Sequence, residues 1–467
     1  MQSRRPQKLR RKVREVQQGD FSGKLEVVHP HAAGIDVGQD EHFVAVPPGS
    51  DPQGRTVRSF RSVTAGCKQM VEWLRASQID TVAMQSTGVY WFALYQILQQ
   101  AGFQVFLVNA SHTKNLPGRK TDVQECQWIM QLHAYGMLSN SFIPEEHIRA
   151  LRTIWRQRTG HVAQASHSLQ RMQKALVTMN LRFHNIAKDM ASVTALRMVR
   201  AIVAGERDVH RLAQLREPGI RATEQEIVES LEGTWQADQI FCLQQHLSLW
   251  DTYHGKIQEC DEMLAQHLGT LPDQPGAEPL SPLRRNKRAK GNAPPVGVLD
   301  IRKELHRITG VDLTSIDGIN VLVAQTIISE CGTDLTAWPS EGQFVAWLKL
   351  CPRPDQSGRT VKRRSPGRTR SPVTVVLRQA ATSLVRSQTY LGAKYRRLQA
   401  KLGKKGGVTA MAGQLARLVY RLMQHGHAYV DKGAEHYEAK LAASKLAYLR
   451  KQAANLGLHL IENTAAA

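Results

Sequence analysis

The sequence has few cysteines and no long apolar run, and both absences exclude classes of protein. The six cysteines are scattered, and no two of them form a C-x-x-C pair. Neither a disulfide framework nor a zinc site is therefore expected, and the thiols should be reduced, as in the cytosol. The sequence contains no run of about 18 apolar residues, so no membrane span is expected. Residues 1–20 are basic but lack the apolar segment of a signal peptide.

Acidic residues are also scarce relative to basic ones. The 467 residues include 62 Lys and Arg against 40 Asp and Glu, a formal net charge of +22. Such an excess favours a polyanionic partner, most commonly nucleic acid; the alternative is a basic protein without one. Hydrophobic residues make up 42%, which excludes a wholly disordered chain. At roughly 150 residues per domain, the length predicts about two to four domains.

Residues 31–140 alternate between strand and helix patterns, after a basic arm over 1–30 that either lies on phosphates or is a solvated tail. Strands are predicted at 32–37, 43–47, 56–60, 80–85 and 103–108, and helices around 71–74, at 91–100 and from about 121. Three strands, helix, strand, helix, strand, helix is the order of the RNase H-like fold, although many α/β domains share it.

Residues 145–268 are predicted to be helical with heptad spacing. One apolar seam runs from Val162 to Met190 and a second from Ile240 to Leu268, with a helical connector of about 50 residues between them. The seams predict a coiled coil, which is either an antiparallel pair within the chain or an oligomerisation stalk.

The remaining sequence divides into a linker and a third domain. Residues 270–297 carry six prolines and the run RRNKRAK, which predicts a disordered basic linker. A mostly helical domain is predicted over 300–455. In it, residues 313–332 resemble a helix-hairpin-helix turn, where Gly318 would expose backbone N–H groups to a phosphate; the alternative is an ordinary glycine-containing turn.

Carboxylates occur at two junctions of strand and helix patterns. Asp36 ends the first predicted strand, and Thr121 with Gln124 fits a capping box, so that a helix should begin at Asp122 with Glu125 on the same face. In an RNase H-like fold that face would pack against the first strand. Three carboxylates brought together repel one another unless a cation lies among them, and Mg²⁺ suits such ligands and phosphoryl transfer. The alternative is ordinary solvated carboxylates.

Ser357 lies in a segment rich in cations and is followed by Gly358, which lets the backbone approach a phosphate. A serine hydroxyl becomes a nucleophile only when a base or a metal activates it, so a structural serine is the alternative. The surrounding cations would hold phosphates. Those expected to bind nucleic acid are Arg353, Arg359, Lys362, Arg363, Arg364 and Arg368.

The segments HAAGIDVGQDEHFVAVPPG, QSTGVYWFALYQIL, NLPGRKTDVQECQWIMQLHAYGML and WLKLCPRPDQSG resemble the DEDD-type transposases of bacterial insertion sequences, family one-hundred-ten. They occur in the family's order over nearly the whole chain, and STGVYW followed by GRKTD is a specific combination. The resemblance implies a RuvC-like N-terminal domain, a coiled coil and a C-terminal domain with a nucleophilic serine. It also implies a guide RNA from the element.

Position by position, the resemblance makes Asp36 the first acid, Asp122 the third and Ser357 the nucleophile, in the pattern L-x-P-x(4)-S-G. The family's Glu before S-T-G-V-Y-W falls on Gln85, and its last acid is Glu125 rather than Asp. Three carboxylates therefore remain as the implied Mg²⁺ ligands.

The predicted function is that of a bacterial DNA transposase, a recombinase that cuts and rejoins DNA strands. Its expected partners are the element ends and target DNA, a guide RNA and further copies of the chain, as a dimer or tetramer. One alternative is a RuvC-like Holliday-junction nuclease that uses the acids only. The other is a non-catalytic DNA- or RNA-binding relative whose acidic site decayed at Gln85.

Overall fold

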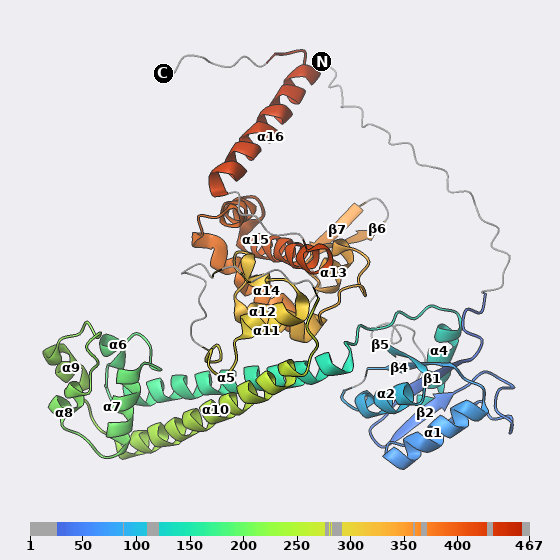
Figure 1. Ribbon diagram of the computed structural model, residues 1–467, viewed down its shortest axis with the longest axis horizontal. Coiled ribbons are helices and arrows are strands. Elements are labelled where there is room, and N and C mark those ends of the chain that lie inside the picture. Colours follow the sequence, from blue (N-terminus) through green and yellow to red (C-terminus); the bar gives the residue numbers. More distant parts are fainter. Residues whose placement is uncertain are drawn as a thin grey trace, which may run out of the picture. The chain divides into compact units, whose positions relative to one another are not determined.

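The computed structural model divides the chain into two compact units, Met1–Ile143 and Pro144–Ala467 (Figure 1). It describes residues 26–86, 88–109, 121–275, 280, 282, 292–357, 360–365, 371–426 and 433–459. All six cysteines lie in these ranges and carry free thiols. Among the described helices, none is long and apolar enough to cross a membrane.

The first unit is a five-stranded mixed sheet with helices. Its elements are β1 (Ala32–Val37), β2 (Glu41–Ala45), β3 (Val57–Arg61), α1 (Thr64–Ala76), β4 (Thr81–Gln85), α2 (Trp91–Gln100), β5 (Gln104–Val108) and α4 (Asp122–Ala134). The strand order is β3-β2-β1-β4-β5, in which β2 is antiparallel to both neighbours and the β1–β4 and β4–β5 pairs are parallel. The predicted strands and helices of this unit are confirmed, with strand bounds shifted by no more than two residues.

Alternation along β1 decides which helices cover which face of the sheet. Ala33 and Ile35 lie in one apolar cluster with residues of α1 and α2. Gly34 points the other way, toward α4, where an added Cβ would lie 2.2 Å from the backbone nitrogen of Met130. Because side chains alternate along a strand, Asp36 shares the α4 face with Gly34. Glycine at position 34 allows α4 to lie directly on β1.

The predicted basic arm over 1–30 ends earlier than expected. Residues 1–25 lie outside the described part, but the N–H groups of Val28 and His29 donate to the carbonyl oxygen of Ala134 at 2.8 and 2.9 Å. The His29 ring also lies against the rings of Phe106 and His133. The last residues of this segment therefore belong to the folded unit.

The second unit begins with two long helices, α5 (Glu146–Thr178) and α10 (Ala237–Gly269). They pack antiparallel within the chain (Figure 1). The His267 ring lies 2.7 Å from the carbonyl oxygen of His147, near the start of α5. Further along, the buried Arg158 forms an ion pair with the buried Asp261. Of the two arrangements that the sequence left open, the structure contains the pair within one chain.

The first predicted seam, 162–190, is not one helix. α5 ends at Thr178 and the chain turns at Asn180, whose φ is 61°. Phe183 and Ile186, beyond the turn, are nevertheless buried in the same cluster as Leu176. The apolar spacing therefore correctly predicted which residues are buried. It wrongly predicted one continuous helix, because the turn at Asn180 folds two separate segments onto the same core. The connector is helical, as predicted: α6 (Phe183–Ile186), α7 (Val193–Val203), α8 (Val209–Gln214) and α9 (Glu224–Leu231).

The centre of the predicted linker over 270–297, with the run RRNKRAK, lies outside the described residues. Both ends are hydrogen-bonded to helices. The N–H of Gln274 donates to the carbonyl oxygen of Arg307 at 2.8 Å. The Asn292 carbonyl accepts from Arg158 at 2.7 Å. At these ends the segment therefore belongs to the folded unit rather than to a linker.

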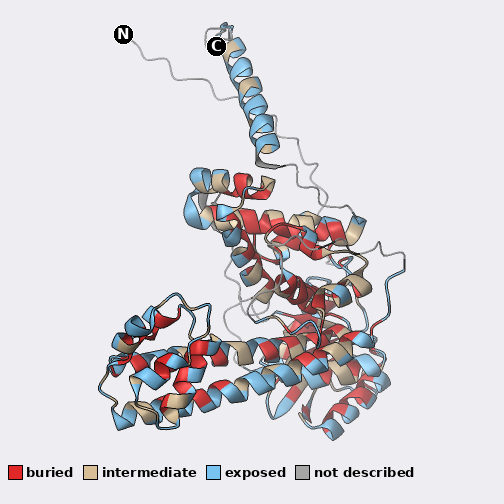
Figure 2. Ribbon diagram, turned by 60° about the vertical axis from the view of Figure 1, so that its left-hand side comes forward, coloured by how far each residue is buried: buried red, intermediate tan, exposed pale blue. Residues whose placement is uncertain are grey.

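The C-terminal part of the second unit is mostly helical, as predicted. Its helices are α11 (Ile301–Thr309), η2 (Leu313–Ser315), α12 (Val321–Cys331), α13 (Glu341–Trp347), α14 (Pro372–Ser383), η3 (Leu384–Arg386), α15 (Tyr390–His425) and α16 (Gly433–Asn455). The sequence missed a hairpin of β6 (Arg353–Ser357) and β7 (Thr360–Ser365), whose polar residues lack the alternation typical of a strand. Figure 2 shows α16 exposed along most of its length.

Side-chain hydrogen bonds and ion pairs join α5 to α12. The indole N–H of Trp155 donates to Thr326 Oγ1 at 3.0 Å. Arg156 donates two hydrogen bonds to the carboxylate of Glu330, at 2.7 and 2.8 Å. Both α12 side chains are buried, so the long helix pair is continuous with the C-terminal core.

Candidate active site

Asp36 and Gln85 lie side by side at the carboxyl edge of the sheet. β1 and β4 are parallel, and Ile35 is paired with Met84, so the next residues along both strands, Asp36 and Gln85, stand at the same level. The pair two positions earlier faces α4, and side chains repeat every second residue on one face. Both side chains therefore face α4, with Gln85 buried and Asp36 partly exposed.

The first turn of α4 lies at the same edge of the sheet. Thr121 caps the helix by accepting a backbone N–H of the first turn at 3.3 Å, so that the helix begins at Asp122, as predicted. At the other end, His133 Nε2 lies 2.8 Å from Thr81 Oγ1, at the start of β4. α4 therefore runs antiparallel to β4, which brings Asp122 and Glu125 to the edge that carries Asp36.

The buried Cys126 reports that two of the carboxylates lie near each other. Burial, then the negative charge of Asp36 and more weakly that of Asp122, raises the pKa of the Cys126 thiol to about 12. Both carboxylates thus act on the same sulfur from different elements. Glu125 follows Asp122 by three residues on the helix and is partly buried. The structure therefore brings all four predicted residues of the acidic site to one sheet edge.

The donor chemistry of this edge fits a hard cation, because carboxylate and amide oxygens are the ligands that Mg²⁺ prefers. Among the described residues, no group of three or more His, Cys, Asp or Glu side chains lies close enough together to hold a metal ion. The edge thus supplies ligand types and location, without a preformed coordination shell.

Ser357 belongs to the other compact unit. It is the last residue of β6 and pairs with Thr360, the first residue of β7. Arg363 pairs with Asp355, and a shift of register follows that pair. Of the predicted nucleic-acid-binding cations, Arg353, Lys362, Arg363 and Arg364 lie on this hairpin, and Arg359 and Arg368 lie outside the described residues.

Gly318 lies in the turn before α12 with a φ of 88°. A Cβ there would lie 3.0 Å from the carbonyl oxygen of Ala380 in α14, so packing alone accounts for a glycine at this position. The following helix is capped by Asn320, whose side chain accepts the N–H of Val323 at 3.0 Å. The phosphate-binding role of Gly318 stays a prediction.

Sequence reasoning missed Tyr90, in the loop between β4 and α2. Its hydroxyl donates to the side-chain oxygen of Gln39 at 3.0 Å, which ties this loop to the turn after β1. Both loops follow the carboxyl ends of strands that carry site residues. The available signal was an aromatic residue in a glycine-containing loop directly after a buried strand.

Comparison with known families identifies this kind of protein. A profile of DEDD transposases of the IS110 type matches residues 33–181, which include Asp36, Gln85 and α4. A second profile, described as the transposase IS116/IS110/IS902 family, matches residues 312–396, which include Ser357. A search of curated proteins found no match. The chain is a DNA transposase, and as such an enzyme that binds DNA. It belongs to the IS110 family of insertion-sequence transposases.

Proposed function

We propose that the chain cuts and rejoins DNA strands with an acidic site on a RuvC-like first unit and a nucleophilic serine on the second. The observation that carries the proposal is the convergence of Asp36, Gln85, Asp122 and Glu125 on one edge of the sheet. The strand order β3-β2-β1-β4-β5, with β2 alone reversed, supports an RNase H-like fold for this unit. The heptad spacing of α5 and α10 supports an antiparallel coiled coil.

The proposed cofactor is Mg²⁺, held by Asp36, Asp122 and Glu125, with the amide oxygen of Gln85 beside them. Members of this family typically use divalent metal ions. When bound, such an ion stabilises the charge that develops on a phosphate during in-line displacement. The chain's own contribution is to hold the oxygen donors on rigid elements, a strand end and a capped helix.

In the proposed serine step, Ser357 Oγ attacks the phosphorus of the scissile phosphodiester. The bond from phosphorus to one DNA hydroxyl oxygen breaks, the serine proton passes to a base, and the leaving oxygen takes up a proton. The product is a phosphoserine ester that keeps the DNA attached to protein until a DNA hydroxyl attacks the phosphorus and releases the serine. The hairpin cations Arg353, Arg363 and Arg364 would hold flanking phosphates.

The experiment incubates the full chain with Mg²⁺, element-end DNA and the element's non-coding RNA, and separates the products on denaturing protein gels. A DNA-linked protein band that disappears in Ser357→Ala, but persists in the hairpin control Ser365→Ala, supports the serine step. Free nicked DNA without a linked band would instead favour a nuclease that uses the acids alone. Cleavage that does not depend on the RNA would contradict the guide RNA that the family resemblance implies.

Gln85 offers a separate test of the acidic site. Gln85→Glu adds a fourth carboxylate beside Asp36, and we expect a modest gain in Mg²⁺ affinity and rate, since ligand charge governs affinity at hard-ion sites. Added repulsion among the acids would instead lower the Mg²⁺ affinity and the rate. A Mg²⁺ titration of cleavage by wild type and Gln85→Glu distinguishes the gain from the loss. A half-saturation point that does not move would place residue 85 outside the ligand set.

A further inference from the structure

An exposed aromatic ring is held in place at the edge that carries the acids. Tyr90 is 43% exposed although its hydroxyl is bonded to Gln39 and its ring packs back on Gly88, where an added Cβ would lie 3.4 Å from the ring. The ring is thus fixed at its polar end and at its base, and part of its surface faces solvent. Its neighbour Val89 is 78% exposed. Exposed apolar groups held rigidly at a functional edge indicate a binding surface.

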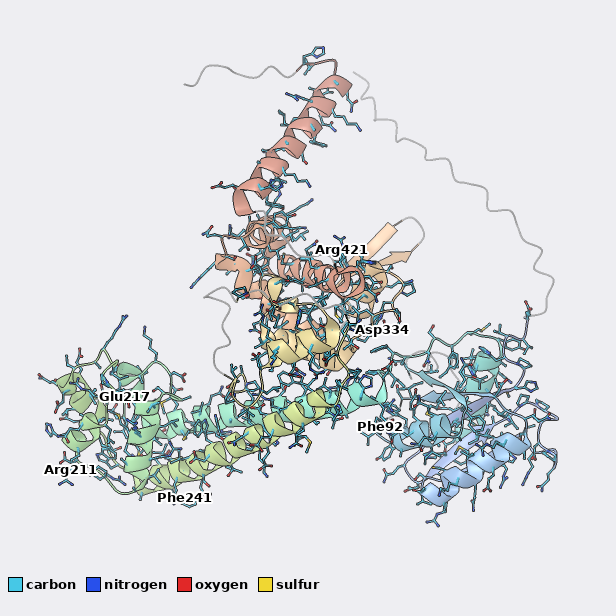
Figure 3. All side chains as sticks on the ribbon, in the orientation of Figure 1. Phe92, Arg211, Glu217, Phe241, Asp334 and Arg421 are labelled. Atoms are coloured by element: carbon cyan, nitrogen blue, oxygen red, sulfur yellow. The ribbon has the colours of Figure 1, made fainter. Side chains whose placement is uncertain are left out.

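The surface continues into α2. Phe92, marked in Figure 3, is 40% exposed and stands edge-on to Trp91 with ring centroids 5.5 Å apart. Trp91 in turn packs against the core of the unit. The exposed Phe92 therefore extends from a helix that begins directly after Tyr90 and packs on the core.

The substrate of a transposase contains one kind of flat apolar group, the nucleobase. Exposed aromatic rings bind bases by stacking, and they do so only where the base is not already stacked in a duplex. Stacking at this edge requires that the strand leaves its duplex near the cut, so that a base is available. We propose that Tyr90 stacks on an unpaired base of the DNA strand whose phosphate lies at the acidic edge. This inference rests on the proposed function, because it requires the strand to pass that edge.

The position of the ring supports a nucleotide as its occupant rather than a second protein. The Tyr90–Gln39 bond joins the loop after β4 to the turn after β1, so the ring stands beside the strand ends that carry Gln85 and Asp36. A strand with its phosphate at these residues would pass the loop that carries the ring, because that loop directly follows the end of β4 at Gln85. The net charge of +22 also favours a polyanion over a protein surface.

The test uses the full chain and a single-stranded oligonucleotide whose thymines are replaced by 5-iodouracil, which cross-links under light to a stacked aromatic ring. We expect the cross-linked peptide to contain Tyr90. Tyr90→Ala should remove this cross-link and weaken binding of the single strand about five- to a hundredfold, with binding of the intact duplex unchanged. Tyr90→Phe keeps the ring and should retain most of both signals.

The matched control is Tyr135→Ala, because Tyr135 is similarly exposed at the opposite end of α4 in the same unit. It should leave both signals unchanged. Tyr90→Leu keeps the apolar volume without the ring, so that a folding defect in Tyr90→Ala does not leave the question open. If Tyr90→Leu cross-links and binds the single strand as wild type does, the proposal is overturned. It is also overturned if Tyr90→Ala lowers the oligomer mass in sedimentation and leaves DNA binding unchanged, because the surface would then be a protein contact.

The outcome is separable from that of the proposed function. Asp36→Asn should abolish cleavage and keep the Tyr90 cross-link, because the carboxylate holds the cation and the ring holds the base. Normal cleavage by Asp36→Asn would contradict the acidic site. A missing cross-link in wild type, with cleavage still dependent on Asp36, would contradict only the stacking.

Discussion

The two compact units carry opposite chemistry. The first gathers three carboxylates at one sheet edge, whereas 75 consecutive residues of the second, 356–430, contain 16 Lys and Arg and no Asp or Glu. In the proposed reaction, the acids would hold the cation that stabilises the transition state, and the basic residues would hold the flanking phosphates. Each unit therefore has a role in the proposed reaction.

The units also differ in how they position their residues. In the first, backbone approach sets the geometry, because α4 lies directly on Gly34. In the second, ion pairs fasten helices together. Arg421, labelled in Figure 3, lies inside the acid-free stretch and donates two hydrogen bonds to the carboxylate of Glu341 in α13, at 2.5 and 2.9 Å.

The sharpest way to break the comparison is to neutralise the acids. Asp36→Asn or Asp122→Asn should lower strand cleavage by about a hundredfold or more. DNA binding should remain, because the proposal assigns it to the cations of the second unit. Gel assays of cleavage and of binding measure both, with Glu72→Gln, exposed on α1, as control. Cleavage near wild type in both variants would remove the acidic site.

The role of ion pairs in the second unit can be tested at Arg158 and Asp261, both 3% exposed at the side chain. Asp261→Ala leaves a buried, unpaired arginine and should cost about 3–5 kcal/mol of unfolding free energy. Asp251→Ala removes a half-exposed pair with Arg200 and should cost less than about 1 kcal/mol. Urea unfolding followed by helical circular dichroism compares them; equal losses would contradict the distinction.

Glycine substitutions compare backbone packing in the two units. Gly34→Ala forces a Cβ into the backbone of α4 and should destabilise the first unit by about 3 kcal/mol or more. Gly160→Ala in α5 meets nothing within 4 Å and should stabilise the helix by about 0.5–1 kcal/mol. Thermal melts show the signs of both changes. A neutral Gly34→Ala would mean that α4 does not lie on β1.

The first unit should also be sensitive to acid through His133. Burial, with the nearby charge of His29, lowers the pKa of His133 to about 4, below the 6.5 of an unfolded histidine. The unfolded state therefore binds more protons between these values, so stability present above pH 6.5 falls by about 3 kcal/mol as the pH drops toward 4. Urea unfolding at pH 6.5 and pH 4 measures the free energy of unfolding, and its change between the two pH values should be smaller in His133→Gln than in wild type. An equal change in both proteins would assign the effect to other groups.

The smallest expected effect concerns the cationic hairpin. Arg363→Gln and Arg364→Gln should each reduce the slope of log affinity against log salt by about one unit if each residue contacts one phosphate. Arg197→Gln, whose partner is Glu217, should leave the slope unchanged. DNA binding titrated at several salt concentrations measures the slopes. Identical slopes for all three variants would exclude the hairpin from the DNA interface.

The sequence predicted elements more reliably than contacts. The strands of the first unit and the start of α4 at its Thr121 cap were predicted correctly, because strand alternation and capping are local patterns. Helix continuity through Asn180 was predicted wrongly, since a buried spacing looks the same whether one helix or two segments supply it. The β6–β7 hairpin was missed because its sequence is mostly polar and lacks the apolar alternation that predicts a strand.

The sequence by itself determined which residues form strands and helices in the first unit, which of them carry charge, and that Asp122 begins a helix. Only the tertiary structure decided that Asp36, Gln85 and the first turn of α4 share one edge, and that Tyr90 reaches Gln39 beside them. The reason is physical: hydrogen-bonding patterns and side-chain periods are set within a few residues. Contacts between residues far apart in the chain depend on how closely backbones pack, as α4 does on Gly34.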